Sequence, residues 1–571
     1  MKQALRFVFC WILIFLVLEI SFIFWLYSNP FANYGTNDDS LISNIFHGYF
    51  GDEYKINLVF IQPLLVLVLE FFENFVSNVN LYGHFLLFTA IASYSSIFTH
   101  FLFLKSKFTK FVSIWIFILF SVTFITWFSI NPTYTGASLF AVGASAFHLL
   151  SAVHNIEKNY KLFLTFLGTG FLSLGYLIRK ESIFIFFVLF IPLFIWLMFK
   201  SRFKSNLKYI FISLSAFLGA LCLNLIAHSF FYNSQDWKKY EEMNNLRHQI
   251  QMRAPEVLIK NNLKSISWDN ETFELFTRMQ LVDKSEMNEE KMKKIIKYTS
   301  DYIGIKSLLK INLSKNLNQI KISFQNWTWV LKLLLLALLM IIVSKIQNQK
   351  FIKNYLIHLF FLVIPIIILL IILSTGYQLP ERITLNLLAA AFPLILLPVI
   401  NDSQKVNIKL PFILIISTAL TLTSWQYLKR FEIETKARLS FYENRIKYAE
   451  QQQKFMANLP EDVVLMGSSS VFKSDWQFPY SSFKPFDQSQ RLVYLGWHNL
   501  SPLWINFLET KKIDGSNFPD SYFNESLIYV ESPENFESLK RYLINSGYKF
   551  EVKELGLYGP SDYYMYKFNL I

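Results

Sequence analysis

The chain has 571 residues, of which 53% are hydrophobic, 18% aromatic and only 17% charged, with a formal net charge of +13. A soluble protein carries about 25% charged residues, and the apolar residues here gather in blocks of about 20, enough to cross a hydrocarbon core about 30 Å thick. The composition therefore excludes a soluble globular protein. Because most basic residues lie between apolar blocks, they indicate membrane topology and no nucleic-acid partner.

Eleven apolar blocks are predicted to be transmembrane helices, which makes the chain an α-helical polytopic membrane protein. In chain order they are residues 5–27, 82–104, 111–130, 134–153, 162–178, 182–199, 209–231, 328–344, 354–374, 384–400 and 410–427. A further block, 56–76, contains Pro63, Glu70 and Glu73, and by itself it fits either a span or a helix along the interface.

Charge in the short loops decides between these two readings of 56–76. The loops after the second, fourth, sixth, eighth and tenth spans hold fourteen lysines and arginines, whereas the opposite short loops hold four. With Lys2 and Arg6 placing the N-terminus inside, the fourteen fall inside only if 56–76 does not cross. The sequence therefore predicts a multi-pass protein of the inner (cytoplasmic) membrane, with its N-terminus inside and its C-terminus outside.

Two domains are expected. Residues 1–429 form a membrane domain, with a first outer loop at 28–81 that carries an interfacial helix and a large outer loop of helical texture at 233–326. Residues 430–571 form a small extracytoplasmic α/β domain, because strand-like runs near 463–466, 491–495, 527–530, 550–555 and 563–568 alternate with a predicted helix at 533–545. In this domain Trp497 and Trp504 are interpreted as core residues, with stacking on a sugar as the alternative.

The first outer loop contains the adjacent carboxylates Asp38 and Asp39. Two carboxylates beside a bilayer are costly unless water, a cation or a basic group meets them. Such a pair suits a general base for an acceptor hydroxyl, or ligands for a divalent cation, so a metal requirement is left open. The alternative is a solvated loop that caps a following helix.

Three further outer segments carry candidate binding residues. The turn after the third span contains Asn131 and Tyr134, whose polar groups suit sugar hydroxyls, although Asn-Pro is also an ordinary turn. Between the fifth and sixth spans lie Arg179, Lys180 and Glu181, cations that run against the topological bias and suit a lipid phosphate. The loop before the tenth span contains Tyr377 and Arg382, for which an interfacial belt is the alternative.

In this arrangement the chain resembles the GT-C class of integral-membrane glycosyltransferases, including bacterial proteins of surface-polysaccharide synthesis. The resemblance rests on Asp38 and Asp39 in the first outer loop, on an interfacial helix introduced by Gln62-Pro63-Leu64, and on outer cations at Arg179 and Arg382. Protein mannosyltransferases have His-Pro-Pro where this chain has Gln62 and one proline. The resemblance covers the membrane region and does not extend to the terminal domain.

The resemblance implies a mechanism. An undecaprenyl-phosphate-linked sugar is the donor, and its phosphate is held by Arg179, Lys180 and Arg382. Asp38 or Asp39 deprotonates a hydroxyl of a glycan, lipid or protein acceptor, which attacks the anomeric carbon with inversion. Lipid phosphate leaves readily once its charge is met, so electrostatic stabilisation supplies much of the catalysis.

Two other functions stay open at this point. A polysaccharide polymerase or ligase, which uses polyprenyl-pyrophosphate glycans, concentrates its cations in one long outer loop, and here Arg247 and Arg253 lie in the 233–326 loop. A non-enzymatic transporter of lipid-linked sugars predicts polar mid-span residues and repeat symmetry. Glu19 is the main mid-span charge, and no repeat is evident, which argues against transport.

Overall fold

A computed structural model gives the arrangement of most of the chain. It describes residues 2–28, 32–35, 37–48, 56–76, 79–103, 124–154, 158–200, 204–253, 268–297, 349–376, 381–400, 454–468, 479–480, 491–558 and 562–571, together with isolated residues between 114 and 118, between 418 and 451, and at 471.

Helices occupy eight of the eleven blocks that were predicted to span. They are α1 (Lys2–Ser28), α4 (Leu81–Leu102), α6 (Tyr134–His154), α7 (Lys158–Ile178), α8 (Ser182–Lys200), α9 (Lys204–Phe231), α15 (Gln349–Gly376) and α16 (Glu381–Ile400). In the described part of the chain, six of them (α1, α4, α6, α7, α9 and α15) are long and apolar enough to cross a membrane, whereas the apolar segments of α8 and α16 are shorter. This is the composition of a multi-pass membrane protein.

The remaining three blocks limit how far the prediction of eleven spans is confirmed. The block at 328–344 lies outside the described residues, and 111–130 and 410–427 are described only in part. Of 111–130, the stretch 124–130 is helical, as predicted.

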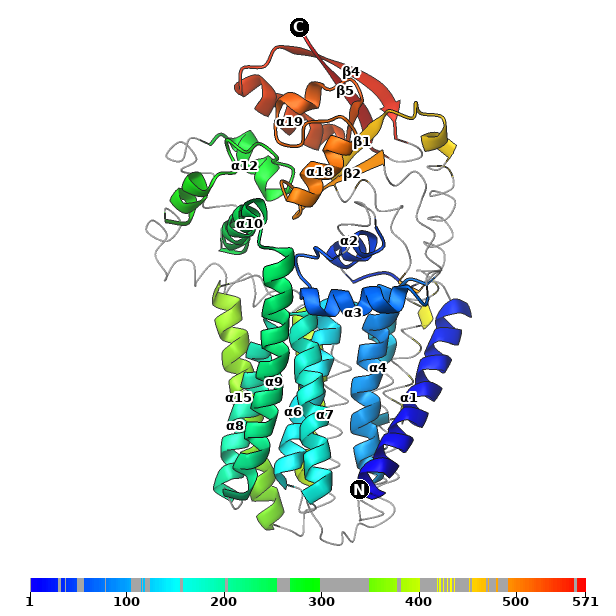
Figure 1. Cartoon of the computed structure of the whole chain (residues 1–571), viewed down its shortest axis with the longest axis vertical. Coiled ribbons are helices and arrows are strands. Elements are labelled where there is room, and N and C mark those ends of the chain that lie inside the picture. The colour runs from blue at the N-terminus through cyan, green and yellow to red at the C-terminus, as the bar shows by residue number, and fades with distance from the viewer. Residues whose placement is uncertain are drawn as a thin grey trace.

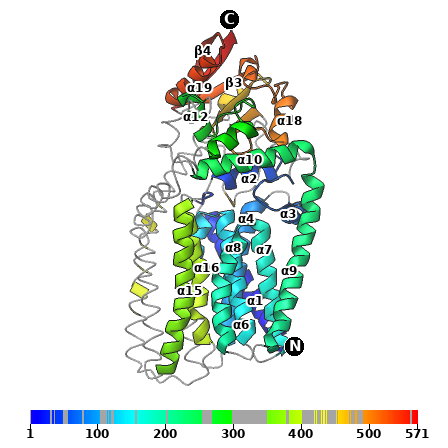
Figure 2. The ribbon, with the colours of Figure 1, turned by 90° about the vertical axis from the view of Figure 1, so that its left-hand side faces the viewer.

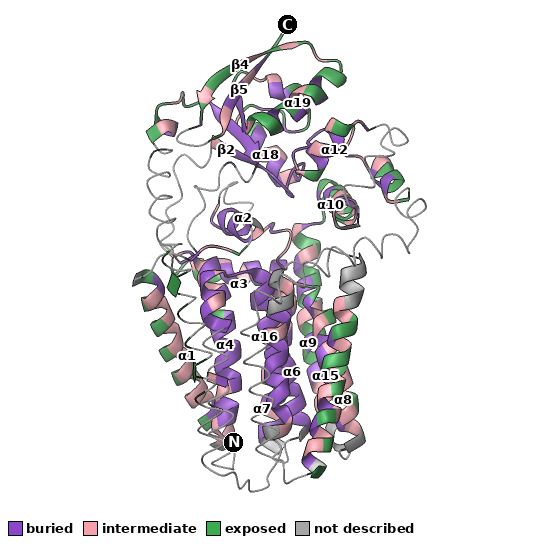
Figure 3. Cartoon of the chain, turned by 180° about the vertical axis from the view of Figure 1, so that it is seen from behind, coloured by how far each residue is buried: buried purple, intermediate pink, exposed green. Residues whose placement is uncertain are grey.

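Helix α6 forms the centre of the bundle. Its apolar stretch is wholly buried, whereas that of α1 is 6% buried, at the periphery, and Figure 3 shows the same contrast between α6 and α1. Small residues allow the close packing that membrane helices need: a Cβ on Gly143 of α6 would lie only 2.7 Å from the Ala390 backbone of α16. The Ser138 hydroxyl of α6 also donates to the Gly175 carbonyl of α7 at 2.9 Å.

Two short helices lie across one end of this bundle. Helix α3 (Pro63–Glu73) lies crosswise to the long helices, and α2 (Asn37–Phe46) lies next to it (Figure 1). The C-terminal α/β region lies beyond them, so we call this the domain end of the bundle. The N-terminal end of α1 lies at the opposite end (Figure 1).

The C-terminal region contains a mixed five-stranded sheet, as the sequence predicts. Its strands are β1 (Val464–Ser468), β2 (Leu492–Leu495), β3 (Leu527–Glu531), β4 (Phe550–Leu557) and β5 (Tyr564–Leu570). Their order is β2-β1-β3-β5-β4, with β1 parallel to β2 and β3, and β5 antiparallel to β3 and β4. The three parallel strands are fully buried, whereas the edge strand β4 is largely exposed.

Two helices follow strands of the sheet. Helix α19 (Pro533–Asn545) follows β3, as predicted, and α18 (Pro502–Thr510) follows β2. Each begins after a serine whose side chain accepts a backbone N–H of the first turn, Ser501 for α18 and Ser532 for α19. Trp504 of α18 is fully buried, in agreement with its interpretation as a core residue.

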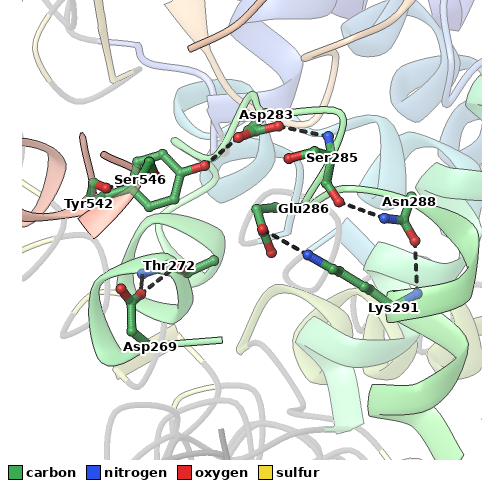
Figure 4. Close-up of polar contacts among 9 residues, drawn as sticks. All are labelled: Asp269, Thr272, Asp283, Ser285, Glu286, Asn288, Lys291, Tyr542 and Ser546. Atoms are coloured by element: carbon green, nitrogen blue, oxygen red, sulfur yellow. Dashed lines mark hydrogen bonds and ion pairs between the residues drawn. The ribbon is translucent and has the colours of Figure 1, made fainter. Parts of the chain in front are cut away.

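The large loop between α9 and α15 packs against this sheet region. It contains α10 (Gln235–Arg253) and α12 (Asn270–Thr277), and α12 packs on α19. The Ser538 hydroxyl of α19 donates to Glu274 at 2.7 Å, and the Tyr542 hydroxyl donates to Asp283 at 2.5 Å (Figure 4). In Figure 2, α10 lies between the bundle and the C-terminal region, so loop and terminal region together form the layer above the domain end.

Candidate functional site

The candidate site surrounds the N-terminus of α6 at the domain end. The chain before α2 is paired there with the turn that precedes α6: Asn33 N–H donates to Ile130 O and Gly35 N–H donates to Pro132 O, both at 3.0 Å. Gly35 is required by this approach, since a Cβ at that position would lie 2.4 Å from the Thr133 side chain. These contacts place the start of α2 directly beside the start of α6.

Asp39 is fully buried at this junction. One of its carboxylate oxygens accepts the backbone N–H of Tyr134 at 2.7 Å and the hydroxyl of Tyr82 at 2.9 Å. Tyr134 is the first residue of α6, so the carboxylate meets one of the unpaired N–H groups of a helix N-terminus and its positive dipole end. Asp39 thereby joins α2, α4 and α6.

Asp38, by contrast, is only half-buried in the first turn of α2. The two adjacent residues therefore differ in burial, since Asp39 is enclosed and Asp38 is partly exposed to solvent. The sequence alone gave no basis for choosing between them.

Arg179 lies at the same helix start. Its guanidinium donates to the Thr135 hydroxyl and lies over the Tyr134 ring, with Cζ 5.2 Å from the ring centroid. Its Nε donates to Glu181 at 3.4 Å. The Arg179 side chain remains 26% exposed, so this positioned cation is accessible to a ligand. Asp39 and Arg179 thus contact consecutive residues of α6.

The helix α3 is anchored beside Arg179 by Gln62. The Gln62 N–H donates to Leu177 O at 2.9 Å, two residues before Arg179. Its side-chain oxygen accepts from Asn224 of α9 at 2.9 Å. Pro63 then begins the helix, where its missing N–H costs nothing. Gln62 therefore fixes where the short helix meets α7 and α9.

Aromatic residues link the site to the layer above it. Phe60 stacks on Tyr134, with ring centroids 6.0 Å apart, and makes an edge contact with Trp497 of the terminal region at 4.6 Å. The Trp497 carbonyl accepts hydrogen bonds from Tyr240 and Arg247 of α10. Phe60 therefore connects the terminal region, and α10 bound to it, to the Tyr134 ring beneath Arg179.

His248 of α10 adds a titratable group to the site. Burial lowers its pKa, the charges of Arg179 and Arg247 lower it further, and Glu181 opposes them. The large loop therefore lies within electrostatic range of the Arg179–Glu181 pair. Sequence patterns give no signal for this contact, nor for Tyr82, because both depend on the packing of distant segments.

The other predicted site residues have varied positions. Asn131 is half-buried, and its N–H and side-chain amide donate to the preceding helical turn, so it takes the ordinary turn role. Lys180 is exposed next to Arg179. Tyr377 and the side chain of Arg382 lie outside the described residues. Within the described ranges, no three His, Cys, Asp or Glu side chains gather as metal ligands.

His498, next to the Trp497 contact, leads to a prediction about pH. Burial lowers the pKa of His498 to about 3, and Arg247 acts in the same direction. An imidazole in the unfolded chain titrates near pH 6.5, so below that pH the unfolded chain binds more protons and stability falls as the pH drops. We expect the titration of His498 to lower the free energy of unfolding by about 2 kcal/mol between pH 7 and pH 5. Melting temperatures of the wild type should therefore fall more over this range than those of His498→Gln, and equal falls would contradict the assignment.

Comparison of the chain with protein-family models, with curated proteins and with solved structures finds no match.

Proposed function

We propose that the chain is a membrane glycosyltransferase that moves a sugar from a polyprenyl-phosphate carrier to a glycan, lipid or protein acceptor. The observation that supports this proposal best is that an acid and a cation lie at one junction of helices. Asp38 adjoins Asp39, which accepts the Tyr134 N–H, and Arg179 lies over the Tyr134 ring and donates to Thr135. The site lies at one end of the bundle, where a lipid head group and a water-soluble acceptor can meet. We assign this end to the outer face of the cytoplasmic membrane on the charge of the short loops.

In the proposed reaction Asp38 takes the proton of the acceptor hydroxyl. The hydroxyl oxygen forms a bond to the anomeric carbon while the bond from that carbon to the phosphate oxygen breaks, which inverts the configuration. The departing lipid phosphate carries the bonding electrons as negative charge, which Arg179 meets. Asp39 does not contact the substrate and acts as a positioning residue, because it fixes α2 against α4 and α6.

The environment of Arg247 favours this proposal over a polymerase or ligase. Arg247 is one of the two cations of the large loop that favour a polymerase or ligase in the sequence, and it is buried. Its guanidinium donates to the carbonyls of Gly496 and Trp497 and to Asn244. The side chain therefore holds α10 to the terminal region instead of presenting a charge to a pyrophosphate. The side chain of Arg253 lies outside the described residues.

A donor panel tests the proposal. The full chain in lipid nanodiscs would be incubated with undecaprenyl-phosphate carrying radiolabelled glucose, galactose, mannose or N-acetylglucosamine, together with bacterial envelope extract as acceptor. We expect label to move from at least one of these donors into the acceptor fraction. Transfer only from undecaprenyl-pyrophosphate oligosaccharides would instead identify a polymerase or ligase and contradict the proposal.

A further inference from the structure

A cleft of about 800 Å³ opens in the layer above the membrane, outside the site at α6. Three segments line it: the first half of α10, residues 284–289 of the large loop, and the length of α18 with its flanking residues. In Figure 1, α18 lies above α10 and to its right, on the side of the sheet. The volume of the cleft lies in the range of small-molecule sites, which often form where domains meet.

The lining combines an apolar wall with many hydrogen-bonding groups. Trp237, Met243 and Ile505 contribute apolar surface, and the hydroxyls and amides come from Ser234, Asn288, Asn506 and Ser516. Sugar rings present the same combination, with apolar C–H faces and hydroxyl edges. A polyhydroxylated ligand therefore fits the cleft better than a lipid chain does.

The charges of the cleft are mostly negative. Its charged residues are the carboxylates Asp236, Glu242, Glu289 and Glu509 and the cations Lys239 and Lys284. Glu289 pairs with Lys293, but among the described residues the other three carboxylates form no ion pair. A concave surface with an excess of carboxylates favours cationic ligands over polyanions. The cleft is therefore unsuited to a lipid phosphate, whose place is at Arg179.

Hydrogen bonds hold the wall at 284–289 in place (Figure 4). Asp283 accepts the Tyr542 hydroxyl and the Ser285 N–H, at 2.5 and 2.7 Å. Asn288 accepts the Lys291 N–H at 2.9 Å, and Lys291 also pairs with Glu286 at 2.7 Å. A wall fixed in this way need not be ordered when a ligand binds, which favours affinity.

The cleft also shares a residue with the contacts above the candidate site. Tyr240 lines the cleft, and its hydroxyl donates to the Trp497 carbonyl at 2.7 Å. Trp497 in turn contacts Phe60, which stacks on Tyr134 beneath Arg179. Tyr240 therefore links the cleft, through Trp497 and Phe60, to the residues of the candidate site.

We propose that this cleft binds the acceptor, and that the acceptor is a saccharide with free amino groups. That the ligand is the acceptor rests on the proposed glycosyltransferase function, whereas its chemical class rests on the residues that line the cleft. The ammonium groups meet Asp236, Glu242 and Glu509, and the hydroxyls bind the serine and asparagine side chains.

Binding of defined oligosaccharides to the full chain in nanodiscs tests the inference without any donor. Calorimetric titration would compare the tetramer of glucosamine with that of N-acetylglucosamine, whose amino groups are acetylated and uncharged. A tetramer of galacturonic acid would be titrated as the anionic comparison. We expect the glucosamine tetramer to bind about tenfold more tightly than its acetylated form at low salt, and this advantage to shrink as salt is added. The anionic tetramer should not bind.

A double substitution, Asp236→Asn with Glu509→Gln, should weaken binding of the glucosamine tetramer about tenfold. The matched control is Glu534→Gln with Glu551→Gln, which removes the same charge from exposed positions of α19 and β4 outside the cleft. Equal affinity for the two tetramers, no binding of either, or equal effects of the two double variants would overturn the inference. These measurements do not involve sugar transfer. Failure of the inference would therefore be distinguishable from failure of the proposed function, which the donor panel tests.

Discussion

Asp38→Asn is expected to reduce sugar transfer about 10³-fold without loss of the fold. Asparagine keeps the size and the helix-terminal position of Asp38 but cannot accept a proton at neutral pH, and a positioned general base contributes about 10²–10⁴-fold. Because Asp38 is half-buried and reachable, the loss should appear in the chemical step. The measurement is the initial rate of label transfer from the best donor, beside the melting temperature of each variant.

Asp39→Asn is the matched comparison on the neighbouring residue. An asparagine oxygen at position 39 is still able to accept the Tyr82 hydroxyl and the Tyr134 N–H. We therefore expect a lower melting temperature and a loss of transfer of about tenfold, since a buried positioning contact is weakened but no proton acceptor is removed. If Asp39→Asn abolished transfer while Asp38→Asn retained it, the roles assigned here would be reversed.

The terminal sheet region shows what sequence patterns resolve well. Helix α19 was predicted over 533–545 and spans those residues, because Ser532 and Pro533 are a strong start signal and apolar residues recur at helical spacing. Helix α18 begins with the same signal, Ser501-Pro502, yet is absent from the sequence-based prediction. Its nine residues are too few for a helical repeat of apolar residues to stand out, so the start signal alone indicates the helix.

The candidate site shows where sequence patterns stop. Topology signals suffice to place Asp39, Arg179 and Tyr134 on one side of the membrane, and the structure adds that they meet at one helix turn. No spacing rule reports this meeting, because it depends on how α2, α4, α6 and α7 pack. The difference between Asp38 and Asp39 has the same origin, since the burial of Asp39 is set by Tyr82, more than 40 residues away.

Arg247 is a residue for which the sequence indicates a binding role that its surroundings do not support. A cation in a long polar loop is expected to be exposed and available to an anionic ligand. Here the guanidinium is enclosed, and burial lowers its pKa while Tyr240 opposes the shift. Its hydrogen bonds to main-chain carbonyls replace the water it has lost. Charge counted along the chain is therefore informative about topology but not about which cation binds a ligand.

Arg179 and Lys180 test whether position or summed charge matters, because they are adjacent cations with different surroundings. Arg179 is held by Thr135, the Tyr134 ring and Glu181, whereas Lys180 is exposed. Charge stabilisation in a transition state depends on groups already in position, and loss of one such contact costs about 10²–10³-fold in rate. We therefore expect Arg179→Gln to lose about 10²–10³-fold in transfer and Lys180→Gln less than about threefold.

Arg179→Lys separates position from charge. Lysine keeps the positive charge but cannot donate two parallel hydrogen bonds to a phosphate or stack in the same plane on Tyr134. Its transfer rate should therefore lie between those of Arg179→Gln and the wild type, with a melting temperature close to that of Arg179→Gln. Equal losses in Arg179→Gln and Lys180→Gln would show that the phosphate responds to the summed positive charge of the loop, and the turn at α6 would then no longer be the place where the leaving group is stabilised.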